Sequence, residues 1–153
     1  MTSSPILKTD PRLDLVLERV VNVPLKLVWK AWTTPEHVSK WFAPRPWIIT
    51  ECRIDLRPGG AFHFVMQSPD GTSHPSTGCY LEVVPGRRLV WTDALLPGYR
   101  PSENPFLTAI IALAPEGKGT RYTATAVERD EATRKRHEEH PNAKTGSWNV
   151  PDP

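Results

Sequence analysis

Apolar residues recur at helical spacing in two short stretches near the N-terminus. The first stretch places them at i, i+3, i+4 and i+7, as Leu25, Val28, Trp29 and Trp32. This spacing is the stripe of an amphipathic helix, and Pro24 suits its first position, where a missing N–H costs nothing. The stripe repeats after a break at Pro35, as Val38, Trp41 and Phe42. The pattern predicts two short helices at an angle, with aromatic side chains pointing to a common side.

From Trp47 onward, short apolar runs alternate with turns built on proline and glycine. The segments 57–60 and 84–87, for example, have proline and then glycine at their central positions, the type II pattern. Six runs rich in β-branched and aromatic residues lie between the turns: 47–56, 61–67, 77–83, 89–95, 107–113 and 121–128. With a run over 13–21 they predict seven antiparallel strands, the last six as a meander. Two short helices cover only part of such a sheet, so a further helix, a ligand or both must fill its concave side.

Alternation along these strands assigns side chains to the two faces of the predicted sheet. One face, which we expect to be concave, receives most of the aromatic residues and a few polar ones: Phe62, Phe64, Met66, Tyr80, Glu82, Trp91 and Asp93. The other face is mixed and carries His63, Cys79 and Thr92. The assignment depends on regular strands, because a single β-bulge inverts it.

Four of the six tryptophans lie between residues 29 and 47. Tryptophan has a large apolar surface and one N–H donor, so this cluster is either a plain aromatic core or the wall of an apolar cavity. We expect Trp29 and Trp32 to pack in the core and Trp41 to face the space for a ligand.

Composition and charge exclude several classes of protein. A chain of 153 residues is expected to form one domain. Its formal net charge is +2 with both signs interspersed, whereas a nucleic-acid-binding face needs clustered Lys and Arg. No apolar run is long enough to span a membrane, and the N-terminus lacks the apolar region of a secretory signal. We therefore expect a cytoplasmic protein with no nucleic-acid or membrane partner, and with Cys52 and Cys79 as free thiols.

Several motifs, in order along the chain, resemble one known family. They are Trp29-Lys-Ala-Trp32-Thr-Thr-Pro35-Glu36 with Trp41-Phe42-Ala-Pro44, then Arg57-Pro58-Gly59-Gly60-Ala-Phe62-His-Phe64, then Gly78-Cys-Tyr80-Leu-Glu82 with Arg88-Leu89-Val90-Trp91-Thr92, and Gly119-Thr120-Arg121-Tyr122. From about Leu13 to about Glu139 the chain is similar to the activator of heat shock protein 90 ATPase homologue-like family, in the START-like, or SRPBCC, superfamily.

The resemblance implies an α+β helix-grip (START-like) fold: a seven-stranded antiparallel sheet wrapped round a long C-terminal helix, with an apolar cavity between them. It also implies binding of a lipid, a sterol, a polyketide or another hydrophobic molecule, and a few members of the superfamily are cyclases or hydrolases. The family is named after a co-chaperone domain, which makes a chaperone a second partner to consider.

The C-terminus departs from the family pattern. The last helix should begin near Asp130 and carry an apolar stripe, but Ala132 is the sole apolar side chain before His140, and Pro141 cannot continue a helix. We therefore expect a shortened or missing C-terminal helix in a domain over 12–140, between a disordered lead-in over 1–11 and an irregular tail over 141–153. Either Trp148 folds back to cover the exposed face or a second copy of the chain does, unless the reading frame is altered or the chain is cut.

Candidate catalytic groups are few. The segment 137–140 has two histidines at i, i+3 and no third ligand, unlike the i, i+4 pair of a zinc protease. We therefore assign no metal and no other cofactor. An enzyme needs titratable groups inside its cavity, and the candidates are Glu82 and Asp93, or Glu51 and His63 if the faces are exchanged. We interpret these side chains as rim or surface charges and assign no catalytic residue.

We expect the chain to bind a small hydrophobic ligand in a cavity, with Asp93 or Glu82 orienting the polar end of that ligand. The predicted ligand-binding residues are Trp41, Phe62, Phe64, Met66, Tyr80, Glu82, Trp91 and Asp93. One alternative is a co-chaperone-like protein-interaction domain, which needs an exposed patch rather than a cavity. Another is a cyclase or hydrolase that uses the cavity carboxylates. A homodimer through the uncovered cavity face is a further expectation.

Overall fold

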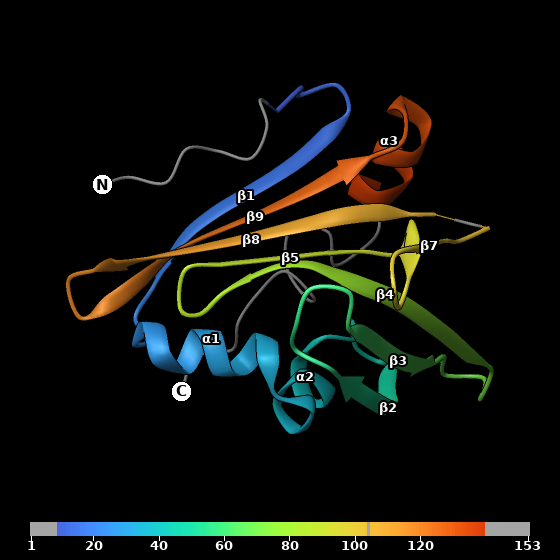
Figure 1. The fold of residues 1–153 in the computed structure, drawn as a ribbon, viewed down its shortest axis with the longest axis horizontal. Helices are drawn as coiled ribbons and strands as arrows, with labels where there is room; N and C mark the ends of the chain where they lie inside the picture. The colour runs from blue at the N-terminus through green and yellow to red at the C-terminus, as the bar shows by residue number, and fades with distance from the viewer. Residues whose placement is uncertain (1–8, 104, 140–153) are drawn as a thin grey trace.

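The computed structural model describes residues 9–103 and 105–139 and has an α+β architecture (Figure 1). Seven strands form one antiparallel sheet of order β1-β9-β8-β5-β4-β3-β2. They are β1 (Asp14–Val21), β2 (Ile48–Ile54), β3 (Ala61–Gln67), β4 (Ser73–Val84), β5 (Arg88–Thr92), β8 (Leu107–Glu116) and β9 (Gly119–Glu128). The predicted fold class is confirmed: the six later strands form a meander, and β1 closes on β9.

Tight turns join successive strands where the sequence predicts them. Gly59 and Gly86 have φ angles of 82° and 72°, a left-handed conformation that a type II turn requires and that glycine adopts at no steric cost. The Val84 carbonyl accepts a hydrogen bond from the Arg87 N–H at 2.9 Å across the second of these turns. The longer connection between β5 and β8 contains a small hairpin of β6 (Leu95–Leu96) and β7 (Arg100–Pro101).

The two predicted helices are present as α1 (Leu25–Thr33) and α2 (Pro35–Trp41), both on one side of the sheet (Figure 1). Pro35 sets their junction, because it has no N–H to give to the Ala31 carbonyl four residues before it. The Nε1 atom of Trp41 donates to that carbonyl instead, at 2.9 Å. This hydrogen bond folds α2 back against α1.

The hydrophobic core lies between these helices and the face of the sheet that points toward them, called the inner face below. Its largest fully buried apolar side chains come from α1 and from five strands: Val28, Trp32, Phe62, Tyr80, Leu89, Ile111 and Tyr122. The outer face is mixed, as predicted, and Val16 and Val20 on β1 are more than half exposed there. The alternation of side chains along each strand therefore decides which of them lie on the inner face, beneath the helices.

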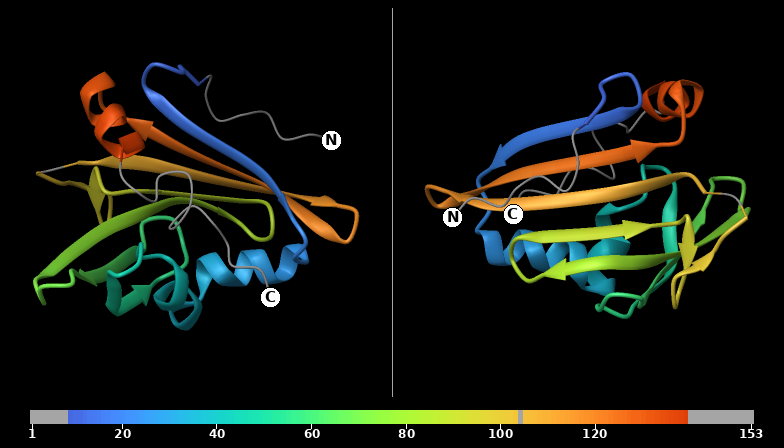
Figure 2. Two further views of the ribbon diagram at one scale, coloured as in Figure 1. Left: turned by 180° about the vertical axis from the view of Figure 1, so that it is seen from behind. Right: turned by 45° about the horizontal axis from the view of Figure 1, so that its top comes forward.

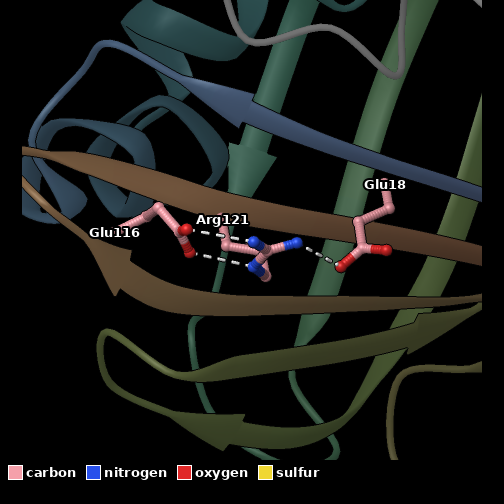
Figure 3. Close-up of polar contacts among 3 residues, drawn as sticks. All are labelled: Glu18, Glu116 and Arg121. Atoms are coloured by element: carbon pink, nitrogen blue, oxygen red, sulfur yellow. Dashed lines mark hydrogen bonds and ion pairs between the residues drawn. The ribbon is translucent and has the colours of Figure 1, made fainter.

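An ion-pair cluster on the outer face joins three strands (Figure 3). Arg121 on β9 donates to both carboxylate oxygens of Glu116 on β8, at 2.9 and 3.0 Å. It also donates to Glu18 on β1 at 2.9 Å. Exposed ion pairs contribute little to stability, but the two parallel hydrogen bonds between Arg121 and Glu116 fix the orientation of the guanidinium relative to the carboxylate. The cluster therefore helps to fix the register of β1 against the β8–β9 hairpin.

The C-terminal helix α3 (Glu131–Glu139) is short in the described part of the chain. Asp130 caps it by accepting a hydrogen bond from the Thr133 N–H at 2.8 Å. The helix lies beside β1 and β9 at the edge of the sheet (Figure 2), where Thr133 is buried and Arg134 donates to the Asp14 carbonyl at 3.4 Å. The predicted plug Trp148, the rest of the predicted tail and residues 1–8 of the lead-in lie outside the described residues.

Candidate ligand-binding site

Aromatic rings from β3, β4, β5 and the end of α2 meet on the inner face. The Phe62 ring is central, with its centroid 5.0 Å from Trp91 and 5.7 Å from Tyr80. Phe64 lies 5.2 Å from Phe62 on the same strand. Phe42, which directly follows α2, meets the Phe64 ring edge-on at 4.9 Å. The structure thus brings four predicted lining residues into one cluster and adds Phe42, which the sequence predicted only as part of a helical stripe.

Met66 and Trp41 stand at the margins of this cluster. Met66 continues the inner face of β3 and is only partly buried. Trp41 is buried, and its ring meets that of Trp32 edge-on at 4.7 Å. Its single donor is already given to the Ala31 carbonyl. Trp41 can therefore offer a ligand only apolar ring surface.

A β-bulge in β4 moves Glu82 off the inner face. Tyr80 lies opposite Trp91, but the register then shifts, so that Glu82 lies opposite Val90. Facing residues of an antiparallel pair share a face, so Glu82 joins Val90 on the outer face, where it forms an ion pair with Arg88. The predicted placement of Glu82 beside Tyr80 is wrong, because one extra residue reverses the alternation.

Asp93 directly follows β5, and its carboxylate holds the start of β8. Its Oδ1 accepts hydrogen bonds from the backbone N–H of Phe106 at 2.7 Å and of Leu107 at 3.0 Å. Burial raises the pKa of the Asp93 carboxyl, and these backbone hydrogen bonds offset only part of that rise. The carboxylate serves the backbone of the loop, whereas the sequence predicted that it orients a ligand.

Four hydrogen-bond donors around the inner face are buried without a partner among the described residues: Trp32 Nε1, Tyr80 Oη, Trp91 Nε1 and Tyr122 Oη. The Tyr80 hydroxyl and Trp91 Nε1 form no hydrogen bond with the residues that the structure describes, although the exposed fractions are 0% for Tyr80 and 7% for Trp91. Such atoms are uncommon in folded proteins. Burial raises the pKa of Tyr80 far above its usual value, and Cys52 adds to the rise. The alternation of the strands predicted both rings, but not that their polar atoms lack partners.

Two other titratable groups, Cys52 and Glu128, are at least partly buried on or near the inner face. Burial raises the pKa of the Cys52 thiol to about 11, with a smaller contribution from Glu36, so the thiol is protonated at neutral pH and a poor nucleophile. Glu128 is buried at the end of β9, on the face of that strand that carries Tyr122. Glu128 was not among the residues predicted from the sequence, although its even spacing from Tyr122 indicates that face.

The alternative pair, Glu51 and His63, lies on the outer face. His63 Nε2 is 3.7 Å from Glu51, and its Nδ1 is 2.8 Å from the Thr77 hydroxyl. In residues 9–103 and 105–139, no three His, Cys, Asp or Glu side chains are grouped closely enough to hold a metal ion. His140, one of the two histidines considered for a metal, lies outside that part. The described helices include none that is long and apolar enough to cross a membrane.

Fold and inner face together define an α+β protein of the helix-grip class. Residues 22–150 match the family described as activator of Hsp90 ATPase homolog 1-like protein. The chain belongs to this family, which is part of the START-like superfamily. The predicted family is confirmed. No curated protein matches the chain.

Solved structures of related proteins share the fold. A protein from Nitrosomonas europaea is 51% identical in sequence, with a TM-score of 0.83 over 86% of this chain and 84% of its own. A protein from Rhodobacter sphaeroides is 22% identical, with a TM-score of 0.72 over 86% of this chain and 82% of its own. An AHSA1-like protein from Aeromonas hydrophila is 23% identical, with a TM-score of 0.65 over 83% and 85%. Function therefore has to be argued from the site.

Proposed function

We propose that the chain binds a small hydrophobic molecule in an apolar cavity between the inner face and the helices. The observation that carries this proposal is the continuous aromatic surface of the inner face, centred on Phe62. Apolar side chains that are only partly buried pack against the same core: Leu15, Leu17, Ile49, Met66 and Leu107. Small-molecule sites have this character, mostly apolar with few polar groups.

Binding without catalysis is the form of this function that the site supports best. The two predicted cavity carboxylates are engaged elsewhere, Glu82 with Arg88 on the outer face and Asp93 with the backbone that begins β8. General acid or base catalysis needs a titratable group within hydrogen-bond reach of the substrate. The two carboxylates proposed for a cyclase or hydrolase are therefore not positioned to act on a ligand at the inner face.

The other partners expected from the sequence stay predictions. Membership of this family is compatible with a chaperone-related role as well as with ligand binding. No contact within the described residues favours a chaperone or a homodimer over a small molecule. A cytoplasmic location likewise stays a prediction.

Titration with a fatty acid, a sterol and 2-acetylnaphthalene, followed by tryptophan fluorescence, tests the proposal. Trp91 and Trp41 are part of the inner face or its margin, so a ligand that enters there changes their surroundings and gives a saturable signal. Met66→Lys places a charge at the partly buried margin, and we expect it to weaken binding at least tenfold, because a charge is costly to bury beside an apolar ligand.

Val16→Lys is the matched control, since Val16 is 53% exposed on the outer face. It introduces the same charge and should leave the affinity unchanged. No saturable signal with any of the three ligands would rule out the proposed function. Equal weakening by both lysine variants would place the binding site somewhere other than the inner face.

A further inference from the structure

Two of the four unpartnered donors, Tyr80 Oη and Trp91 Nε1, belong to neighbouring strands and share one face. Tyr80 and Trp91 are directly opposite each other in the register of β4 and β5, so their side chains leave the sheet side by side. Both rings pack against Phe62, Tyr80 stacked on it and Trp91 edge-on. The polar atoms of both residues are inaccessible to solvent and make no hydrogen bond in the described structure.

These two atoms have the same hydrogen-bonding requirement. An indole N–H can only donate, and a neutral phenol donates through its O–H. Because burial raises the pKa of Tyr80, the phenol stays protonated over the whole range in which the protein would be studied. A group that satisfies both residues must therefore be a hydrogen-bond acceptor.

The surroundings of the two donors select against a charged acceptor. The rings packed around them are Phe42, Phe62 and Phe64. The titratable group that influences Tyr80 is the Cys52 thiol, which is protonated at neutral pH. Arg88, on the neighbouring strand β5, is held in its ion pair on the outer face. A carboxylate buried against these rings would be separated by the sheet from the Arg88 guanidinium, and an unpaired buried charge is costly.

We propose that the ligand carries a neutral carbonyl oxygen, as in a ketone, an ester, an amide or a quinone, and that Tyr80 Oη and Trp91 Nε1 donate hydrogen bonds to it. This inference rests on the proposed function, because it names the class of ligand that the same inner face takes. The aromatic cluster supplies affinity for the hydrocarbon part, and the two donors select its polar group.

Three ligands of nearly the same shape test the inference: 2-isopropylnaphthalene, 2-acetylnaphthalene and 2-naphthoate at pH 8. The first has no acceptor, the second a neutral carbonyl and the third a carboxylate. We expect the ketone to bind about tenfold more tightly than either of the others, because buried donors left unpaired by the wrong ligand are penalised.

Tyr80→Phe removes one donor and keeps the ring, so it should reduce the difference between the affinities for the ketone and for the hydrocarbon. Trp91→Phe should act in the same direction. Tyr99→Phe makes the same chemical change at a tyrosine that is 49% exposed, and should alter neither affinity. Infrared spectra of carbonyl-labelled ketone should show a hydrogen-bonded C=O stretch that Tyr80→Phe shifts toward the unbonded position.

The outcomes separate this inference from the proposed function. Equal affinities for ketone and hydrocarbon, or tighter binding of the naphthoate, would overturn the inference while hydrophobic binding stands. Failure of all three naphthalenes to bind also overturns it, and the fatty acid and sterol titrations then decide the proposed function. An unaltered ketone preference in Tyr80→Phe and Trp91→Phe would show that other donors are responsible.

Discussion

At the scale of single residues, Trp41 supplies the donor that Pro35 cannot. The Ala31 carbonyl is near the end of α1, where the residue four positions later is a proline, and the Trp41 indole fills the gap at 2.9 Å. Both partners of this hydrogen bond are buried. The helix junction, and with it the position of Phe42 over the aromatic cluster, depends on a side chain that we had expected to face a ligand.

Trp41→Phe should therefore destabilise the protein even without ligand. The phenyl ring keeps most of the apolar contact but leaves a buried carbonyl without a donor, at a cost of about 1–3 kcal/mol. Unfolding in urea, followed by circular dichroism, measures the loss. Trp29→Phe makes the same change at a half-buried position on α1 and should cost less. Equal losses would mean that the hydrogen bond is not the reason.

Asp93 gives a prediction about pH. Its folded-state pKa is raised by burial, so between the usual aspartate pKa of about 4 and the raised value the native state binds more protons than the unfolded state. Stability attributable to this residue is fully present at low pH and is lost as the pH rises through that window.

Asp93→Asn keeps an oxygen acceptor for the two backbone N–H groups but cannot ionise. The free energy of unfolding of this variant, relative to the parent, should therefore increase as the pH is raised from about 4 to 7. Asp93→Ala cannot ionise either and should follow the same pH trend relative to the parent, but it also removes the acceptor, so it should be about 1–2 kcal/mol less stable than Asp93→Asn at every pH. Urea titrations at several pH values measure both. If the parent instead became more stable relative to Asp93→Asn as the pH rises, the raised pKa of Asp93 would be contradicted.

At the scale of elements, the start of β9 is packed directly against the end of β1. A Cβ added to Gly119 would lie 2.2 Å from the Val21 carbonyl oxygen, whereas one added to Gly71 in the β3–β4 turn would meet nothing within 4 Å. Gly71 has a φ of 87°, so a side chain there suffers backbone strain alone, about 1–2 kcal/mol.

Gly119→Ala should destabilise the fold clearly more than Gly71→Ala, because the strand backbone itself would have to move. Both variants add a single methyl group, so their difference in thermal midpoint isolates the close approach of β1 and β9. Similar midpoints for the two would show that β1 can shift away from β9 at little cost.

The elements also show where prediction from the sequence succeeded. Proline and glycine in the turns placed the hairpins, and the apolar stripes placed α1 and α2. β4 begins at Ser73, four residues before the predicted start, since its first residues are polar and exposed and carry no alternating signal. The bulge after Tyr80 was invisible for a different reason: it depends on how β4 pairs with β5, which is a tertiary property.

At the scale of the whole molecule, the site is a small part of one continuous core. Alternation alone predicted that Phe62, Tyr80 and Trp91 would meet, because an apolar face must be buried. It could not predict the contacts of polar atoms. The Asp93 carboxylate, which is bound to backbone N–H groups, was therefore predicted to orient a ligand, and the four buried donors without a partner were missed. The alternating pattern of a strand predicts where its apolar side chains lie. Which hydrogen bonds the polar atoms form depends on the three-dimensional structure.

Because the cluster joins α2 to three strands, a ligand bound there should stabilise the entire fold. A ligand that binds only the native state at a hundred times its dissociation constant adds about 2.7 kcal/mol, which for a domain of this size corresponds to a rise in thermal midpoint of roughly 5–10 °C. Thermal unfolding at increasing 2-acetylnaphthalene measures it. The rise should be small in Met66→Lys and unchanged in Val16→Lys, since these residues lie on opposite faces. A rise that survives in Met66→Lys would mean that the stabilising ligand binds away from the inner face.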